Sequence, residues 1–283
     1  MDKLSLIVAV YNDIKALDLV MTALNIQSFK GFEVIIADDG SGEKMQRFIH
    51  NQIKKDKIFK LHYVFQEDKG FRKNKIMNEA IKKASTNYLV FIDGDCVPHS
   101  NFLKEHYENI KNNTVLCGKR VNLSKRLSDE LTKIKILDGS FEKVTFKHFY
   151  DSWRNRKIRS TYVEEGLIVK NKYLRKIFLK EDQHIVGCNF SLQKKLIEKV
   201  NGFDENYTGP GIGEDSDLEF RLRLINTEFY SLRNLAVLFH LYHKQTLGSK
   251  QNLRYFQEVQ KLGEYRCRNG IVKLKSIEKA APE

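Results

Sequence analysis

Short apolar runs alternate with amphipathic segments through the first third of the chain. The runs have the length of strands and carry almost no polar residue, as expected of strands buried on both faces. The segments between them repeat apolar residues every three or four positions, which is the period of a helix with one buried face. Together they predict a mostly parallel α/β sheet flanked by helices. The expected strands cover residues 4–10, 32–37, 60–65 and 88–93, and the expected helices cover 14–25, 43–55 and 75–84.

Three of the expected strands end in polar residues. Tyr11-Asn12-Asp13 follows the first strand, Asp38-Asp39-Gly40-Ser41 follows the second, and Asp93-Gly94-Asp95 closes the fourth. The carboxyl ends of parallel strands meet at one edge of a sheet, where open α/β proteins bind ligands. We therefore expect these three segments to line one site.

The Asp93-Gly94-Asp95 segment has the chemistry of a cation site. Glycine permits a tight turn between the two acids, so both carboxylates can face one hard cation. Asp95 is placed to bind the cation directly, and Asp93 to contact a ribose or a metal-bound water. Oxygen ligands beside a diphosphate favour Mn²⁺ or Mg²⁺ over softer metals. A solvated acidic turn is the competing interpretation of so short a motif.

The second half of the chain is less regular. Residues 121–180 are rich in basic residues and scattered aromatics, which indicates an insertion or a variable region that contacts a second ligand. Apolar runs return over 186–240, with a helix expected at about 215–225. Residues 244–283 form a basic tail whose apolar residues have near-helical spacing. Such a helix suits either an anionic membrane surface or packing on the main domain.

Composition is that of a globular protein. The chain has 283 residues, of which 41% are hydrophobic, and no Ser/Gly-rich linker divides it. No run approaches the ~20 apolar residues that cross a bilayer, and the start of the chain lacks a signal-peptide pattern. We therefore expect a cytoplasmic protein, either soluble or peripheral at the inner face of the cell membrane. The four cysteines lack the paired spacing of a zinc site and are expected to be free thiols: Cys96, Cys117, Cys188 and Cys267.

The charge balance narrows the classes of partner. Lysine and arginine number 49 against 36 acidic residues, a formal charge of +13. Such an excess suits nucleic acid, an anionic membrane surface or a polyanionic substrate. No zinc-finger spacing and no aromatic RNA-binding motif accompany it, so we expect no nucleic-acid partner. An anionic membrane surface is the better candidate, although part of the excess is ordinary solubilising surface.

The three strand ends, together with Gly213-Glu214-Asp215-Ser216-Asp217, resemble the inverting, nucleotide-sugar-dependent glycosyltransferases of family 2. The resemblance covers about residues 3–243 and implies the GT-A fold, a Rossmann-like sheet between helices. It divides the chain into a transferase domain, 1–243, and a basic helical tail, 244–283. Within the domain, the resemblance implies a nucleotide-binding half, 1–120, and an acceptor-binding half, 121–243.

The resemblance also assigns the residues around the nucleoside. It implies that Asp39 accepts the imide N–H of uracil, while Ala9, Tyr11 and Asn12 surround the base and ribose. A carboxylate at a strand end can accept such a donor. The alternative for Asp39 is a turn or helix-capping role, since Asp-Gly-Ser favours turns. Asp38 is equally suited to bracing the loop.

A basic loop over residues 67–75 leads into the expected third helix. Backbone N–H groups at a helix start, beside Arg and Lys, attract phosphate. The resemblance implies that Arg72 and Asn78 lie beside the nucleotide sugar, and it leaves Lys69, Lys73 and Lys75 unassigned. The competing interpretation is a solvated loop, because most runs of charged residues face water.

The third metal ligand is expected from Phe239-His240-Leu241-Tyr242-His243, just after an expected strand. The family has a metal-binding histidine at a comparable point, which implies that Asp95 is joined by His240 or His243, with His240 preferred. An imidazole ligand favours Mn²⁺ over Mg²⁺. A lone histidine is more often a structural residue.

The resemblance to galactosyltransferase-like members assigns Asp215 as catalytic base and Glu214 as a ligand of acceptor hydroxyls. The alternative is a set of acids stabilised by a helix N-terminus, the role expected for Asp217. One position departs from those relatives: Ile212 replaces an aromatic residue that can stack on the acceptor sugar. Gly187-Cys188-Asn189 matches the family as a pocket floor or as core structure.

The implied enzyme is a metal-dependent hexosyltransferase that inverts the anomeric carbon. Its expected donor is a UDP-sugar, with galactose or N-acetylgalactosamine favoured, and its acceptor is a glycan or lipid-linked glycan of bacterial surface polysaccharide. The alternatives are a sugar-phosphate nucleotidyltransferase and a non-catalytic carbohydrate-binding protein. A nucleotidyltransferase would place a Gly-rich loop after the first strand, where this chain has Tyr11-Asn12-Asp13. A glycosidase would need neither the uracil ligand nor the metal.

Overall fold

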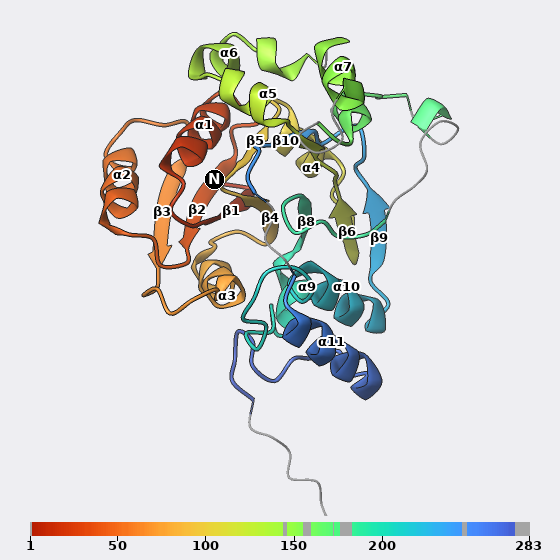
Figure 1. Cartoon of the computed structure of the whole chain (residues 1–283). Helices are drawn as coiled ribbons and strands as arrows, with labels where there is room; N and C mark the ends of the chain where they lie inside the picture. The colour runs from red at the N-terminus through yellow and green to blue at the C-terminus, as the bar shows by residue number, and fades with distance from the viewer. Residues whose placement is uncertain are drawn as a thin grey trace, which may run out of the picture.

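The computed structural model describes residues 2–143, 146–154, 160–171, 173–175, 183–244 and 248–274. Two sheets and the helices around them account for most of these residues (Figure 1). The larger sheet has seven strands in the order β3-β2-β1-β4-β8-β6-β9, and the smaller has three in the order β5-β10-β7. The large sheet contains β1 (Leu4–Val10), β2 (Phe32–Asp38), β3 (Lys60–Phe65), β4 (Tyr88–Asp93), β6 (Thr114–Cys117), β8 (Phe190–Gln193) and β9 (Glu228–Ser231). The small sheet contains β5 (Cys96–Pro98), β7 (Val121–Asn122) and β10 (Leu238–His240).

The first four strands form the parallel half of the large sheet, as the alternating pattern predicts. β1 lies between β2 and β4, and every residue of β1 and β2 is buried. Their registers place Val10 opposite Asp38 and Ala9 opposite Asp93. The polar residues that follow the three strands therefore emerge side by side at one edge.

Helices cover both faces of the sheet, as predicted. The described helices are α1 (Ile14–Asn25), α2 (Glu43–Ile53), α3 (Lys73–Lys83), α4 (Phe102–Glu108), α5 (Lys125–Glu130), α6 (Lys133–Leu137), α7 (Phe146–Arg154), α9 (Lys194–Lys199), α10 (Asp215–Leu224) and α11 (Lys250–Leu262). Short 3₁₀ turns occur at Ser140–Glu142 and Val163–Gly166. Among the described helices, none combines the length and apolarity needed to cross a bilayer.

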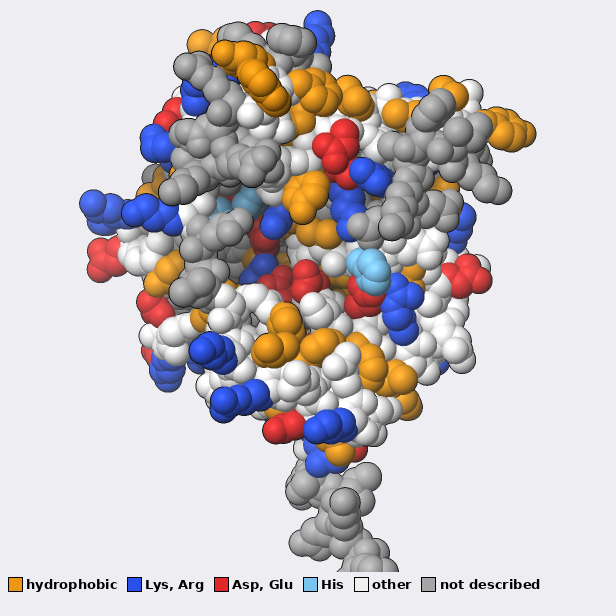
Figure 2. Space-filling view, turned by 45° about the vertical axis from the view of Figure 1, so that its right-hand side comes forward, with side chains coloured by type: hydrophobic (Ala, Val, Ile, Leu, Met, Phe, Trp, Pro, Cys, Tyr) orange, Lys and Arg blue, Asp and Glu red, His pale blue; other side chains and the backbone are white. Residues whose placement is uncertain are grey.

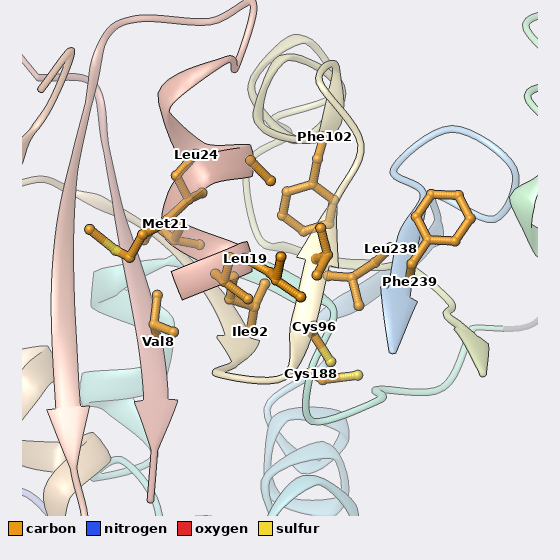
Figure 3. Packing of buried hydrophobic residues seen from close by; sticks show 14 of the residues in the cluster. Val8, Leu19, Met21, Leu24, Ile92, Cys96, Phe102, Cys188, Leu238 and Phe239 are labelled. Atoms are coloured by element: carbon orange, nitrogen blue, oxygen red, sulfur yellow. The ribbon is translucent and has the colours of Figure 1, made fainter. Parts of the chain in front are cut away.

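The core consists of two apolar clusters separated by the sheet. Alternate residues of β1 enter different clusters, Leu6 and Val8 on one face and Ile7 on the other, because strand side chains alternate in direction. The first cluster packs β1 and β4 against α1 and α4, and Figure 3 shows Val8, Met21 and Ile92 within it. The second cluster packs the opposite face against α3, α9 and α10. Each face is thereby sealed from water.

One central strand runs against the others. β8 is antiparallel to both β4 and β6, and Phe190 pairs with Phe91. The antiparallel direction places the residues just before β8, Cys188 and Asn189, beside the carboxyl end of β4. The long segment before β8 thus returns to the same edge that carries Asp93.

The small sheet brings the end of the domain to the same edge. β10 pairs antiparallel with β5, and His240 lies opposite Cys96, one residue after Asp95. A strand was expected at 235–239, and the structure has it at Leu238–His240. This pairing joins the segment just after β4 to the end of the proposed transferase domain.

The basic tail contains α11 and packs on the domain. The hydroxyl of Tyr255 donates to Asp204 Oδ2 at 2.9 Å, and the ring of Phe256 lies 6.2 Å from that of Phe220 in α10. Of the two alternatives for the tail, the structure has the packed helix. Part of the predicted tail, residues 245–247 and 275–283, lies outside the described residues.

Candidate functional site

The carboxyl ends of β1 and β4 meet the start of α10 in an acidic hollow. Figure 2 shows Asp and Glu side chains gathered there, with Lys or Arg side chains beside them. Lys73, at the start of α3, lies at the centre: its Nζ is 2.6 Å from Asp93 Oδ1 and 2.7 Å from Glu214 Oε1. A single ammonium group therefore joins an acid at the end of β4 to an acid just before α10.

The charges of this cluster depend on one another. Burial lowers the pKa of Lys73, but the carboxylates of Asp93 and Glu214 outweigh it and raise that pKa well above its usual value. Burial raises the pKa of Glu214 to about 7; Asp93 and Asp215 add to the rise, and Lys73 opposes it. Glu214 therefore changes protonation near neutral pH, which suits a group that exchanges hydrogen bonds with hydroxyls.

Asp215 begins α10 and is held by two backbone donors. Gly187 N–H donates to its Oδ2 at 3.1 Å, and Ser216 N–H donates to its Oδ1 at 2.8 Å. These bonds fix the carboxylate while leaving further lone pairs available. Gly213, just before it, has φ +125° and lies against the ring of Tyr207, so only glycine fits there.

Asp95, His240 and His243 form a cluster of possible metal ligands. One ligand atom from each residue lies within 4.8 Å of the others. Asp95 Oδ2 is 3.4 Å from His240 Nε2 and 3.6 Å from His243 Nε2. Burial raises the pKa of Asp95, but His240 and His243 outweigh it and hold that pKa at about 2. A carboxylate and two imidazoles that face one another can hold one divalent cation. Both histidines, and not one alone, lie close enough to Asp95 to belong to this cluster.

Two buried free thiols lie next to this cluster. Figure 3 shows Cys96 and Cys188 next to each other at the edge of the core. Arg120 Nη1 donates to Cys188 Sγ at 3.3 Å, and burial is the main reason that the pKa of the Cys96 thiol is raised. All four cysteines are free and buried, in agreement with the sequence analysis.

Asp39 and Asp38 separate into two roles. Asp39 accepts from Gln66 Nε2 at 2.5 Å and from the backbone N–H of Arg72 at 2.9 Å, so it joins the end of β2 to the start of α3. Burial raises the pKa of Asp39. Asp38 is fully buried and accepts from Tyr63 and Ser41, so it braces the loop.

The expected nucleoside ligands surround the same loop. Tyr11 exposes 55% of its surface, and its hydroxyl donates to Asp68 Oδ2 at 3.0 Å. Asn12 has φ +53° and accepts from Gly42 N–H at 2.9 Å. The carbonyl of Ala9 accepts from Gly94 N–H at 2.7 Å, which holds the turn that precedes Asp95. A Cβ on Gly94 would lie 2.7 Å from Val10 Cγ1, so the turn requires glycine.

Two residues of the basic loop have different surroundings. The side chain of Arg72 donates to the carbonyl of Glu67, while its Nε is buried without a hydrogen-bond partner among the described residues. Asn78 is fully buried, and its amide donates to Phe203 O at 2.9 Å and accepts from Phe203 N–H at 2.9 Å. Asn78 therefore connects α3 to the turn after α9, and we leave it out of the proposed donor site.

Lys73 and Arg120 are the site residues that sequence reasoning left unassigned. Lys73 belongs to the basic loop singled out in the sequence, but nothing in the spacing shows that it points inward. Arg120 gives no signal of its own among the many basic residues. Asn189 was expected to form a pocket floor or core structure. Its amide donates to Lys119 O and Ala236 O, and the residue is fully buried.

Comparisons with known proteins agree with this architecture. Residues 5–200 match the model described as glycosyl transferase family 2, and residues 178–244 match the model for the N-terminal domain of galactosyltransferase. The chain is 25% identical to a chondroitin synthase from Escherichia coli, over 88% of this chain and 36% of that protein. It is 28% identical to a GalNAc(5)-diNAcBac-PP-undecaprenol beta-1,3-glucosyltransferase from Campylobacter jejuni, over 63% of this chain and 62% of that protein. The chain covers only 23–36% of the length of the chondroitin and hyaluronan synthases it matches.

Solved structures support the fold assignment. TarS from S. aureus in complex with UDP-GlcNAc has a TM-score of 0.58 at 18% identity, over 92% of this chain and 65% of that chain. The mannosyltransferase PcManGT from Pyrobaculum calidifontis, with GDP-Man and Mn²⁺, has a TM-score of 0.55 at 14% identity, over 93% of this chain and 62% of that chain. These likenesses show a GT-A fold. Because the family model also covers well over half of the sequence, the chain belongs to glycosyltransferase family 2.

Proposed function

We propose that this protein transfers a hexose from a UDP-sugar to a glycan hydroxyl, with inversion at the anomeric carbon. The observation that carries the proposal is the placement of Asp215 in the same acidic hollow as Asp93, joined through Glu214 and Lys73. A direct displacement needs one base and a stabilised leaving group, and no enzyme nucleophile. In this proposal Asp215 is the base, and Asp95, His240 and His243 would hold a cation that stabilises the leaving UDP.

Asp95, His240 and His243 fit a divalent cation. When bound, such a cation neutralises charge on the diphosphate of the donor. The carboxylate–imidazole set favours Mn²⁺, and the related fold of PcManGT was determined with GDP-Man and Mn²⁺. The sequence favours His240 over His243 as the third ligand. In this proposal both histidines bind the cation.

The nucleoside lies over the ends of β1 and β2 in this proposal. Asp39 accepts the imide N–H of uracil, and the exposed ring of Tyr11 packs beside the base. Arg72, whose Nε has no partner among the described residues, is positioned to meet the donor phosphates. TarS was determined with UDP and with UDP-GlcNAc, and these complexes support the uridine donor of this proposal.

The acceptor approaches from the side of α10. Asp215 removes a proton from the acceptor hydroxyl, and that oxygen attacks the anomeric carbon opposite the departing UDP. Glu214 holds a neighbouring hydroxyl, and Lys73 keeps Glu214 and Asp93 in place. Positioning and charge neutralisation supply most of the rate.

The relatives also support a choice of donor sugar and of biological role. The match of residues 178–244 to a galactosyltransferase domain favours galactose or N-acetylgalactosamine. The chondroitin synthases and the undecaprenol-linked glucosyltransferase among the relatives favour a glycan or lipid-linked glycan acceptor in bacterial surface polysaccharide. A peripheral position at the inner membrane face would bring the enzyme to such an acceptor.

Calorimetry with UDP, with and without Mn²⁺, tests the donor half of the proposal. We expect tight UDP binding only with the metal, and its loss in Asp95→Ala while circular dichroism shows an unchanged fold. A donor screen that detects UDP release, followed by NMR of the product, then identifies sugar and anomer. Metal-independent UDP binding by both proteins would contradict the metal assignment, and a product with retained configuration would contradict the single displacement.

A further inference from the structure

A second concave site lies between α10 and α11. It is a cavity of about 420 Å³, within the size range of small-ligand sites. Its walls combine apolar and polar side chains, as carbohydrate pockets require. They include Ile185, Ser216, Glu219, Phe220, Phe256 and Gln260.

The cavity begins beside the proposed base. Ser216 directly follows Asp215 and lines the cavity, while Gly187, which donates to Asp215, is two residues from the lining residue Ile185. From Ser216 the cavity follows α10 as far as Arg223, roughly 10 Å at 1.5 Å per residue. That length accommodates a sugar residue beyond the one that presents its hydroxyl to Asp215.

The walls match the two surfaces of a pyranose ring. Phe220 of α10 and Phe256 of α11 lie 6.2 Å apart with their planes at 87°, so they offer an aromatic corner to the C–H face of a ring. Ser216 and Gln260 lie at the border and can exchange hydrogen bonds with hydroxyls. An aromatic corner with a polar border distinguishes the cavity from a purely structural gap.

The charged groups of the cavity are already balanced by one another. Glu219 accepts from Ile185 N–H at 2.8 Å, contacts His184 Nδ1 at 2.7 Å and accepts from Arg223 Nε at 2.9 Å. This network holds the loop before Gly187 against α10. It leaves neither a net anion nor a net cation to select a charged ligand, so the cavity suits the uncharged face of a sugar.

We propose that this cavity is an acceptor subsite that binds the sugar residue next to the one being glycosylated. The inference rests on the proposed transferase function and extends it: the enzyme acts on glycan chains of at least two residues in preference to single sugars. It also gives α11, the helix of the basic tail, a direct part in acceptor recognition.

The test compares acceptor length in the parent protein and in Phe256 variants. UDP release from the best UDP-sugar is measured with mono-, di- and tetrasaccharides from chondroitin, hyaluronan and β-glucan, and with water alone. We expect kcat/KM of the parent to rise at least tenfold from the mono- to the disaccharide of the preferred series. Phe256→Ala should lose that gain without changing donor hydrolysis in water, and Phe256→Tyr, which keeps a ring, should retain it.

Leu262→Ala is the matched control, because Leu262 lies on the same helix, is 65% exposed and lies outside the cavity lining. A length gain that persists in Phe256→Ala, or no gain in the parent, overturns the subsite and leaves the transferase intact. If UDP-sugar is hydrolysed but no saccharide accelerates UDP release, the glycan acceptor and its subsite are both rejected. If UDP-sugar is neither bound nor hydrolysed, the proposed function itself fails.

Discussion

Lys73 shows what a sequence reveals at the scale of one residue and what it conceals. It stands in a run of charged residues, where most lysines point into solvent. In the structure its side chain is only 15% exposed and contacts both Asp93 and Glu214. A charged loop has the same composition whether its cations face water or acids, because the partner acids come from distant segments. The strand-end acids could be predicted, since each follows a buried apolar run, but their partners could not.

The role proposed for Asp215 gives the first residue-scale prediction. Asp215→Asn removes the base and keeps one of the two backbone hydrogen bonds, because Gly187 N–H and Ser216 N–H donate to different oxygens of the carboxylate. We expect kcat to fall by roughly 10²-fold or more, the scale of general base catalysis, with UDP affinity nearly unchanged. Steady-state kinetics and calorimetry measure the two quantities. Asp129→Asn, the same change at an exposed position of α5, is the control, and undiminished turnover in Asp215→Asn would move the base to Glu214.

Glu214 predicts a pH-dependent stability. Its pKa rises from 4.5 to about 7 on folding, chiefly through burial, so the folded protein holds the proton more tightly. This contribution to the free energy of unfolding is complete below about pH 4.5 and is lost as pH rises through about 7. Glu214→Gln cannot lose a proton, so its Tm should improve relative to the parent between about pH 5 and pH 8.

Differential scanning fluorimetry across that range measures the effect. Glu258→Gln, at an exposed position of α11, serves as control and should follow the parent at every pH. A constant Tm difference between Glu214→Gln and the parent would show that Glu214 titrates at its ordinary pKa in the folded protein.

At the scale of elements, the regular part of the fold was predictable and the irregular part was not. The parallel strands were predicted from short apolar runs and the first three helices from their apolar period, and the structure confirms both. β5, β7 and β10 have three, two and three residues, too short for a period to be read, yet they carry His240 to Asp95. The antiparallel direction of β8 likewise has no local signal, because it depends on where the preceding segment returns to the sheet.

The turn before α10 yields an element-scale prediction. Gly213 has φ +125°, and a Cβ there would lie 1.9 Å from the Tyr207 ring, so Gly213→Ala must move the start of the helix. We expect a loss of about 1–3 kcal/mol in the free energy of unfolding, together with a fall in kcat, because Asp215 is displaced. Chemical denaturation and kinetics measure both.

Gly139→Ala is the matched control for that change. Gly139 also has a positive φ, +72°, but a Cβ there would meet no atom within 4 Å. Backbone strain is thus common to the two variants, whereas the collision and the displaced base belong to Gly213 alone. Equal kcat losses in both variants would contradict the positioning role of this turn.

At the scale of the whole molecule, the tail is part of the fold. After α11 the chain returns to the turn that follows α9, where Asn201 Nδ2 donates to the carbonyls of Cys267 and Val272 at 2.8 Å each. Ile271 belongs to the apolar residues packed on the second core cluster. The sequence allowed either a membrane-binding or a packed tail, because a basic amphipathic helix suits both.

Removal of residues 251–283 should therefore destabilise the protein. We expect Tm to fall by several degrees, since a loss of 1 kcal/mol shifts Tm by about 2–4 °C at this size. Leu262→Ala, at an exposed position of α11, is the control and should leave Tm close to that of the parent. Sedimentation with anionic liposomes at low and high salt tests the membrane hypothesis separately. An unchanged Tm in the truncated protein would contradict the packed role of the tail.

The pairing of β10 with β5 has a consequence for the synthesis of the protein. On the ribosome, the strands that carry Asp39 and Asp93 emerge early, and contacts local in sequence can form among them. Asp95 acquires His240 only after almost the whole domain has been translated, when the chain closes a long loop at an entropic cost. A nascent or prematurely ended chain therefore carries Asp95 without His240 and His243, and these three side chains come together only when the domain is finished.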